Sequence, residues 1–383
     1  MARIMIFATA GAGGDLPPLM SATLALRERG HDTTFVGDAA LRRLTDTLGI
    51  KADVLPGELD LGPRLAAIIG QAMSAAGGDL NKAGPMVQRG LTVWAHEVAG
   101  HVVTAVERHQ PALIMTSLFG VEAVDAACPP VPWTVINSTF YVGPNPPRPL
   151  ELDWGSRAIA LVHRYAELLE SPDLVLHATD QHFDYGFNRL PSRHHYVGPL
   201  GIWEPRQEIP PQLNADGGPW VLVSVSTQRQ DDLAIAEAAL TALADRPVRV
   251  LVTLGSEHQP SEITSRPPNA TVLQTASHAA VLERAALLIG HAGHGTVMKS
   301  LWHGKPMILI PWGRDQPGVA ARAEALGVAA VLQPVQATPS VLGATVDEVL
   351  ASEEMRERAT AQSVRLRATD PPEAAAGLLE TLV

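Results

Sequence analysis

Short apolar runs alternate along this chain with segments whose apolar positions recur at helical spacing. Continuous apolar runs of about four to eight residues are typical of strands that are buried on both faces of a parallel sheet. The runs form two series, separated by a proline- and glycine-rich passage at 199–219. The first series of predicted strands lies at 3–9, 32–37, 112–117, 133–137, 174–178 and 194–198, and the second at 220–225, 248–254, 270–274, 286–290, 307–311 and 329–333.

This alternation predicts an α/β protein with two doubly wound domains. We expect an amino-terminal domain over 1–198, a linker over 199–219 and a carboxyl-terminal domain over 220–369. The least regular part, 57–104, is rich in Gly, Ala and Met. It is interpreted either as a mobile lid or acceptor wall, or as a plain helical insertion.

A glycine-rich turn follows the predicted strand at 286–290 and precedes a predicted helix. It contains His291, Gly293, His294, Gly295 and Thr296. At such a helix start, unpaired backbone N–H groups and the positive end of the helix dipole point at one spot. The turn is therefore a candidate anion site.

The next predicted strand, at 307–311, ends before a second polar turn that contains Asp315 and Gln316. An acid next to an amide offers both acceptors and donors, which suits a polyol such as a sugar. The carboxyl ends of neighbouring parallel strands face one crevice, where the ligands of open α/β sheets bind. We therefore expect the two turns to serve one ligand, with an anion at the first turn and a sugar at the second.

The first predicted strand leads into the turn GAGGDLPP at 11–18. A dinucleotide fingerprint that starts at Gly11 would need a third glycine where the chain has Leu16, so NAD binding is disfavoured. Asp15 is the single ionisable side chain of the turn. It is interpreted either as an N-cap, with Pro17 and Pro18 in the first helical turn, or as a general base.

Composition narrows the classes of partner. The net charge of −11 disfavours nucleic acid and anionic membranes, which bind clustered Lys and Arg. The single cysteine, Cys128, excludes an intramolecular disulfide and a cysteine-based metal site. No apolar run approaches the roughly 18 residues of a membrane span, and the start of the chain does not resemble a signal peptide. We expect a cytoplasmic protein with no membrane span.

The stretch 287–332 resembles the nucleotide-sugar signature of GT-B glycosyltransferases of family 1, particularly bacterial enzymes that glycosylate antibiotics and other secondary metabolites. That signature reads H-x-G-x-G-T, a helix, G-x-P, an apolar strand, D-Q and an A-R helix. The G-x-x-G-D-x-x-P at 11–18 resembles the acceptor-side motif of the same family in its aspartate variant. The resemblance continues through YVGP at 196–199 and a closing helix over 370–383.

The resemblance implies a GT-B fold of two Rossmann-like domains facing a central cleft, with the closing helix packing back on the amino-terminal domain. It implies an inverting transfer of a sugar from a dTDP- or UDP-sugar to a hydroxyl of an apolar small-molecule natural product. Asp15 would be the general base. The chain contains no D-x-D sequence, so no metal and no cofactor is expected. Whether the protein forms a homodimer is left open.

The resemblance also implies roles for residues of the carboxyl-terminal half. The sugar would be held by Asp315 and Gln316, and the nucleotide and its diphosphate by Ser226, His278, His291, Gly293, His294, Gly295 and Thr296. Surface exposure remains the alternative for His294. An ordinary turn remains the alternative for Ser226 and for the pair Ser277–His278.

The chain departs from the family pattern at three places. Lys299 replaces a glutamate that grips the ribose hydroxyls in many relatives, and Val319 replaces an asparagine or glutamate. The segment 115–117, where relatives with a histidine base carry an orienting aspartate, has no carboxylate. Two alternatives are therefore kept, a nucleotide-sugar epimerase of the same fold and a non-catalytic binding or auxiliary protein.

Overall fold

The computed structural model describes the whole chain except residues 10–13, 205–209, 215–217, 228–229 and 231. The chain divides into two compact units. The amino-terminal unit comprises Met1–Trp203 and Asp370–Val383, and the carboxyl-terminal unit comprises Glu204–Thr369. The division between residues 203 and 204 falls inside the passage that the sequence marks as a linker.

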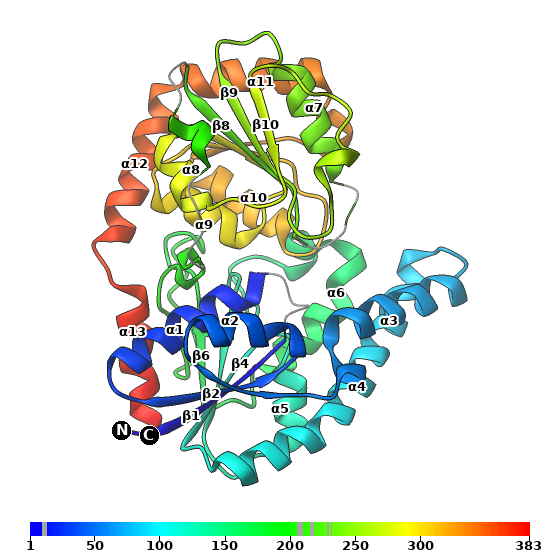
Figure 1. The fold of residues 1–383 in the computed structure, drawn as a ribbon, viewed down its shortest axis with the longest axis vertical. Coiled ribbons are helices and arrows are strands. Elements are labelled where there is room, and N and C mark those ends of the chain that lie inside the picture. The colour runs from blue at the N-terminus through cyan, green and yellow to red at the C-terminus, as the bar shows by residue number, and fades with distance from the viewer. Residues whose placement is uncertain (10–13, 205–209, 215–217, 228–229, 231) are drawn as a thin grey trace. The chain divides into compact units, whose positions relative to one another are not determined.

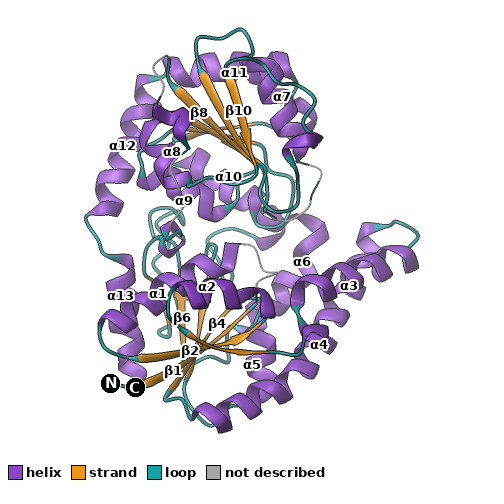
Figure 2. Cartoon of the chain, viewed as in Figure 1, coloured by secondary structure: helices purple, strands orange, loops and turns teal. Residues whose placement is uncertain are grey.

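The amino-terminal unit is built on a seven-stranded parallel sheet (Figure 2). Its strands are β1 (Arg3–Ala8), β2 (Asp32–Gly37), β3 (Lys51–Val54), β4 (Leu113–Ser117), β5 (Trp133–Asn137), β6 (Leu174–His177) and β7 (His194–Tyr196). Their order in the sheet is β3-β2-β1-β4-β5-β6-β7. The order reverses between β1 and β4, which is where ligands of open α/β sheets bind.

β3 is absent from the series of strands that the sequence predicts. Its sequence is KADV, and it lies at the edge of the sheet with β2 as its one neighbour. Lys51 is exposed and the other three residues are half-buried. An edge strand has less surface to bury, so it needs no continuous apolar run, and a search for such runs misses it.

The helices of this unit before residue 170 are α1 (Leu16–Glu28), α2 (Arg42–Thr47), α3 (Leu61–Ala75), α4 (Leu80–His109), α5 (Val121–Ala127) and α6 (Leu150–Leu168), with 3₁₀ turns at Ala39–Leu41 and Gly57–Leu59. The segment 57–104 is thus largely helical. α4 packs against α5 and α6, and Trp94 and Val98 of α4 are buried. The Trp94 indole N–H donates to the Leu59 carbonyl at 2.8 Å. The segment is thus helical, as the insertion alternative has it, and its role as a lid or acceptor wall stays a prediction.

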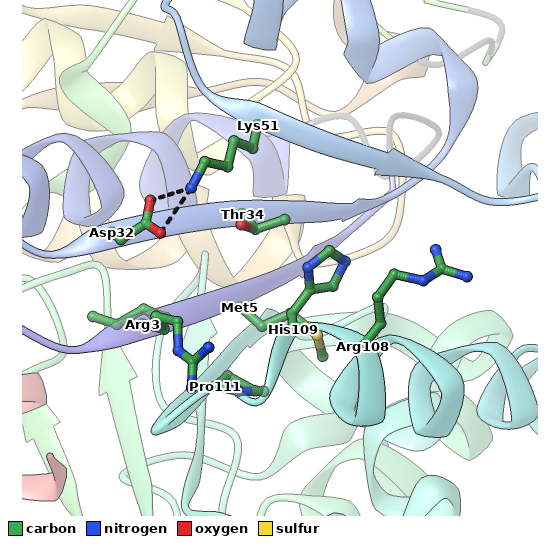
Figure 3. Close-up of a pocket in the computed structure, with 9 residues that line it drawn as sticks. Arg3, Met5, Asp32, Thr34, Lys51, Arg108, His109 and Pro111 are labelled. Carbon is green, nitrogen blue, oxygen red and sulfur yellow. Dashed lines mark hydrogen bonds and ion pairs between the residues drawn. The ribbon is translucent and has the colours of Figure 1, made fainter.

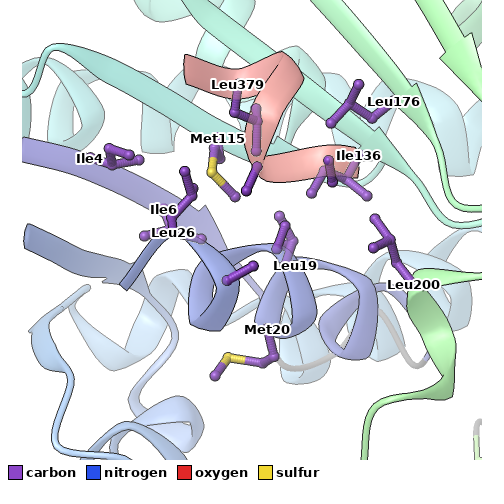
Figure 4. Close-up of a cluster of buried hydrophobic side chains, with 14 of the residues drawn as sticks. Ile4, Ile6, Leu19, Met20, Leu26, Met115, Ile136, Leu176, Leu200 and Leu379 are labelled. Carbon is purple, nitrogen blue, oxygen red and sulfur yellow. The ribbon is translucent and has the colours of Figure 1, made fainter. Parts of the chain in front are cut away.

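The end of the chain completes the core of the amino-terminal unit. Helix α13 (Pro371–Leu379) lies beside α1, and both helices cover the same face of the sheet (Figures 1 and 4). Leu379 is fully buried in the same apolar cluster as Leu19 and Met115. At its edge, the Arg29 guanidinium binds the carboxylates of Glu373 and Glu380. Short 3₁₀ turns lie at Leu200–Ile202 and Glu380–Leu382.

The carboxyl-terminal unit has a six-stranded parallel sheet with the order β10-β9-β8-β11-β12-β13. Its strands are β8 (Trp220–Ser224), β9 (Arg249–Thr253), β10 (Ala270–Leu273), β11 (Ala285–Gly290), β12 (Met307–Leu309) and β13 (Ala329–Val331). Its helices are α7 (Leu233–Leu243), α8 (His278–Arg284), α9 (His294–Trp302), α10 (Gln316–Ala325), α11 (Pro339–Ala351) and α12 (Glu353–Arg367), with 3₁₀ turns at Pro211–Asn214, Pro260–Glu262 and Pro334–Gln336.

The strand order of this second sheet reverses between β8 and β11. Both units are therefore doubly wound parallel α/β structures, and the predicted fold class is confirmed in this respect. Among the residues that the structure describes, no helix is both long and apolar enough to span a membrane.

Candidate functional site

Three loops of the carboxyl-terminal unit follow neighbouring strands at the carboxyl edge of the sheet. Ser226 follows β8, His291 follows β11, and the turn 312–316 follows β12. β8 and β11 are the two strands between which the strand order reverses. The topology therefore brings the candidate anion turn and the candidate sugar turn to the switch point, where a ligand is expected.

The His291 side chain lies directly over the glycine turn. A Cβ atom at position 293 would approach the His291 Nε2 atom to 2.5 Å, so a glycine is needed there. Gly293 is the N-cap of α9, and its side-chain-free backbone leaves room for the ring. The imidazole and the first-turn N–H groups of α9 thus lie at one spot, which is the arrangement of an anion site.

The other predicted residues of this turn differ in exposure. His294 is buried, with 6% of its surface exposed, so the surface alternative for it is wrong. Gly295 and Thr296 are half-buried. The described part of the turn therefore keeps its backbone within reach of a ligand at Gly295 and Thr296, while His294 packs inward.

Asp232, which the sequence analysis did not select, connects the loops at the switch point. Its Oδ2 atom accepts hydrogen bonds from the Ser226 backbone N–H at 2.6 Å and from the Gln230 amide at 3.0 Å. The same oxygen lies 3.9 Å from His291 Nδ1. His291 Nδ1 is also 3.4 Å from the Ser224 carbonyl oxygen. The carboxylate is fully buried, so its bonds hold the Ser226 loop in place beside His291.

The Gln316 side chain binds the backbone of its own turn. Its Oε1 atom accepts from the backbone N–H groups of Trp312 at 2.8 Å and Gly313 at 3.1 Å. Its amide nitrogen donates to Gln230 Oε1 at 3.1 Å. Gln316 is buried, whereas the preceding Asp315 is half-buried. The sugar contacts predicted for this pair stay predictions, and Asp315 is the more accessible of the two.

The pair Ser277–His278, at the start of α8, is bonded to the Glu204 carboxylate, and the nucleotide contact predicted for His278 stays a prediction. The Glu204 carboxylate accepts from the backbone N–H groups of His278 at 3.2 Å and Ala279 at 3.3 Å, and from the Ser277 hydroxyl at 2.8 Å. The Lys299 ammonium lies 2.7 Å from the same carboxylate. Lys299, the departure from the family pattern, is therefore the partner of Glu204.

Glu204 and His278, which meet at the start of α8, both have shifted pKa values. Burial works against ionisation of Glu204, but the Lys299 ammonium and its hydrogen bond outweigh burial and lower the pKa of Glu204. Burial, reinforced by Lys299, lowers the pKa of His278 to about 4. His278 is thus neutral at pH 7, and its Nε2 atom is 3.0 Å from the Thr253 hydroxyl. Val319, the other departure, is fully buried in α10.

In the amino-terminal unit, Asp15 follows β1 at the first residue before α1. It occupies the N-cap position, but its side chain makes no capping hydrogen bond. Its Oδ1 atom instead accepts a hydrogen bond from the hydroxyl of Ser138, which follows β5. Asp15 therefore holds the predicted N-cap position, with Pro in the first helical turn, but without a side-chain cap bond, and its role as general base stays a prediction. Residues 10–13 of this turn lie outside the described residues.

Ser138 is a partner of Asp15 that the sequence analysis did not select. The segment 115–117 is buried in β4, where the Thr116 hydroxyl donates to the Phe7 carbonyl at 3.0 Å. The signal for Ser138 was a hydroxyl directly after a predicted strand, which is common in turns and therefore weak. Burial, together with the negative charge of Asp15, raises the pKa of Tyr165. The carboxylate therefore has a hydroxyl partner and a neutral phenol in its neighbourhood.

A hollow of about 250 Å³ lies at the opposite, amino edge of the same sheet (Figure 3). Two of the cations that line it have acidic partners: Lys51 binds Asp32 at 2.8 Å and Arg108 binds Asp53 at 2.6 Å. The candidate residues Asp15 and Ser138 lie beyond the carboxyl ends of their strands. We therefore do not place the functional site in this hollow.

The described residues contain no group of three or more His, Cys, Asp or Glu side chains arranged to hold a metal ion. This observation concerns the side chains alone.

Comparison with known proteins gives a family match for the carboxyl-terminal half. The model of the glycosyltransferase family 28 C-terminal domain matches residues 221–372. Demethyllactenocin mycarosyltransferase of Streptomyces fradiae is 29% identical over 210 residues, which cover 53% of this chain and 44% of that protein. The match thus spans less than half of that relative.

Two further comparisons extend over nearly the whole chain. O-mycaminosyltylonolide 6-deoxyallosyltransferase of Streptomyces fradiae is 25% identical, with 95% of this chain and 89% of that protein covered. The crystal structure of the glycotransferase of kitacinnamycin superposes with a TM-score of 0.76 at 20% identity and covers 100% of this chain and 99% of its own. At that identity the likeness concerns the fold.

Proposed function

We propose that this chain, a GT-B protein whose residues 221–372 form a glycosyltransferase family 28 C-terminal domain, transfers a sugar from a dTDP- or UDP-sugar to a hydroxyl of an apolar small-molecule natural product. The observation that carries the proposal is the turn after β11. There the His291 ring lies over Gly293 at the start of α9, beside the point where the strand order reverses. The names of the two Streptomyces relatives support the class of acceptor.

The negative charge that develops on the departing nucleoside diphosphate must be stabilised. We assign this task to His291 and to the first-turn N–H groups of α9, because preorganised donors and a helix N-terminus stabilise developing charge without a metal. The proposed reaction is accordingly metal-independent. Asp315 would accept hydrogen bonds from sugar hydroxyls.

The acceptor hydroxyl needs a base, and we assign that task to Asp15. The acceptor oxygen attacks the anomeric carbon while its proton passes to the Asp15 carboxylate. The bond from the anomeric carbon to the diphosphate oxygen breaks, and the diphosphate leaves. One displacement of this kind inverts the anomeric carbon. The hydrogen bond from Ser138 supports the role, since it orients the carboxylate.

Transfer assays in EDTA test the assignment, with UDP-glucose and dTDP-glucose as donors and a panel of macrolide aglycones as acceptors. In the wild type we expect transfer from one of the donors. Asp15→Asn should lower kcat by about 10²- to 10⁴-fold, the usual contribution of a general base, and leave the Kd for the nucleotide unchanged. His291→Ala should lower kcat and also weaken nucleotide binding.

Matched controls are Asp46→Asn on α2 and His96→Ala on α4, because both side chains are exposed. Both controls should behave as the wild type. If the Asp15 and His291 variants showed small and equal decreases in kcat and in nucleotide affinity, the assignment would be contradicted. Nucleotide-sugar turnover at the same rate without an acceptor would point to an epimerase instead.

A further inference from the structure

Asp232 is a buried carboxylate that the family resemblance does not assign. It precedes α7, but its side chain makes no capping hydrogen bond to that helix. Oδ2 is held by Ser226 and Gln230, and Oδ1 accepts no hydrogen bond from any described residue. A buried carboxylate is costly unless a positive charge or several donors compensate it. Among the described residues, the His291 imidazole, which is cationic when protonated, is a partner within reach, with Nδ1 3.9 Å from Asp232 Oδ2.

The surroundings of His291 decide which of its ring nitrogens carries the proton. Nδ1 faces two acceptors, the Ser224 carbonyl oxygen at 3.4 Å and the Asp232 carboxylate at 3.9 Å. A carbonyl oxygen cannot donate, so Nδ1 carries the hydrogen in the neutral ring. Nε2, next to Gly293, then presents a lone pair to the turn. A lone pair repels a phosphate oxygen, so the neutral ring cannot donate a hydrogen bond to a diphosphate there.

Burial favours the neutral form of the His291 ring. Burial lowers the pKa of His291 and outweighs the Asp232 carboxylate, which favours the charged ring. The Arg314 guanidinium, from the turn after β12, also opposes a charge on His291. His278, from the loop before α8, is itself neutral at pH 7. A bound diphosphate would add negative charge on the Nε2 side, opposite Asp232.

We propose that binding of a nucleoside diphosphate protonates His291 at Nε2, and that Asp232 is the positioning residue that supports the resulting imidazolium. The proton comes from solvent and no covalent bond to the ligand forms. In the bound state the ring donates from Nδ1 toward Ser224 and Asp232 and from Nε2 to a phosphate oxygen. The proposal rests on the proposed function, because it requires the diphosphate to bind at this turn.

Titration calorimetry with UDP and dTDP tests this on the full chain, in EDTA and at pH 8, where both ligands are fully ionised. Binding enthalpies in two phosphate-free buffers of different ionisation enthalpy give the number of protons taken up. We expect uptake approaching about one proton per nucleotide, and an affinity that falls up to about tenfold per pH unit above neutrality. Asp232→Asn should abolish the uptake and weaken binding about tenfold or more.

Asp245→Asn is the matched control, because Asp245 is exposed; it should keep the wild-type uptake. His291→Gln is a second variant, which is used if Asp232→Asn does not fold. It is expected to bind the nucleotide without proton uptake, because the glutamine amide is a neutral donor. Wild-type binding without uptake, or full uptake in either variant, would overturn the inference and leave the proposed function standing. Failure of both nucleotides to bind the folded protein would overturn the proposed function and this inference together.

Discussion

At the scale of single residues, several candidate residues are held by a group from another loop. Asp15 is held by Ser138, and the Ser226 backbone N–H and the His291 ring both lie close to Oδ2 of Asp232. Such contacts fix the direction of a reactive group before substrate arrives, which is the basis of preorganised catalysis. Substitutions that leave the reactive group intact but move it are therefore informative.

Gly293→Ala is expected to weaken UDP binding by about ten- to hundredfold, because the added Cβ would lie 2.5 Å from His291 Nε2 and displace the ring. Calorimetric measurement of the Kd checks this. Gly70→Ala in α3 is the control, since its Cβ would meet no atom within 4 Å. The control should keep the wild-type Kd and stabilise the helix by about 0.5–1 kcal/mol. Equal affinities for all three proteins would contradict the placement of the ring.

Ser138→Ala is expected to lower kcat by about tenfold or more, because the Asp15 carboxylate loses its hydroxyl partner. Hydrogen bonds to charged groups contribute about 1.5–3 kcal/mol. In the Asp15→Asn background the same substitution should change kcat little, since the carboxylate that Ser138 orients is already gone. Initial rates of the four proteins of this cycle measure the coupling. Independent, additive effects would show that Ser138 does not act through Asp15.

At the scale of elements, the last strands of the amino-terminal sheet share a buried polar network. His177 at the end of β6 and His194 at the start of β7 stack with ring centroids 5.3 Å apart, and their nitrogens are 3.1 Å apart. Asn137 at the end of β5 reaches His177 at 2.9 Å, and the Tyr141 ring packs edge-on against both histidines. Side chains of Asn137, His177 and His194 thus link β5, β6 and β7, in addition to the backbone hydrogen bonds of the sheet.

This network makes stability depend on pH. Burial lowers the pKa of His194 to about 4 from a usual value of 6.5, and it lowers the pKa of His177 as well. The unfolded chain therefore takes up protons below about pH 6.5 while the folded chain does not. The free energy of unfolding is therefore highest above about pH 6.5 and decreases as the pH falls toward 4. The decrease due to His194 is on the order of 3 kcal/mol.

Urea unfolding at pH 7 and pH 4.5 measures the loss. His194→Asn should be less stable at pH 7 but should show a smaller decrease on acidification, because the depressed group is gone. His163→Asn in α6 is the control, as His163 is exposed, and it should follow the wild type. An unchanged pH dependence in His194→Asn would contradict a neutral, buried His194.

At the scale of the whole molecule, the amino-terminal unit is assembled from both ends of the sequence. α13 contributes Ala375, Ala376 and Leu379 to the cluster around α1, so the first unit is complete only when the end of the chain is in place (Figure 4). Leu379→Ala should therefore destabilise the unit that contains Asp15 by about 2–5 kcal/mol. Leu152→Ala, with 56% of the Leu152 surface exposed, should cost far less.

Denaturant unfolding followed by hydrogen exchange checks this prediction, with peptides from α1 and β1 as reporters of the amino-terminal unit. We expect faster exchange there in Leu379→Ala and little change in peptides from β8 and β11. A loss confined to the carboxyl-terminal unit would show that α13 does not serve the first unit.

The sequence by itself determined the fold class and much of the candidate site. Buried parallel strands need continuous apolar runs. These runs located the other strands of the first sheet, which are β1, β2 and β4 to β7, and the strands of the second sheet. Turn chemistry after β11 and β12 then selected His291, Gly293 and Asp315 from a few local residues. The edge strand β3 was missed because its half-buried KADV sequence carries no such run.

Only the tertiary structure decided which groups work together. Ser138 lies 123 positions from Asp15, and the two meet because both loops leave the carboxyl ends of their strands. Gln316 and Gln230, 86 positions apart, and His291 and Asp232 meet in the same way beside the second switch point. Such contacts depend on the order of strands in the sheet, which is set by long-range pairing, so local patterns of polarity and spacing could not reveal them.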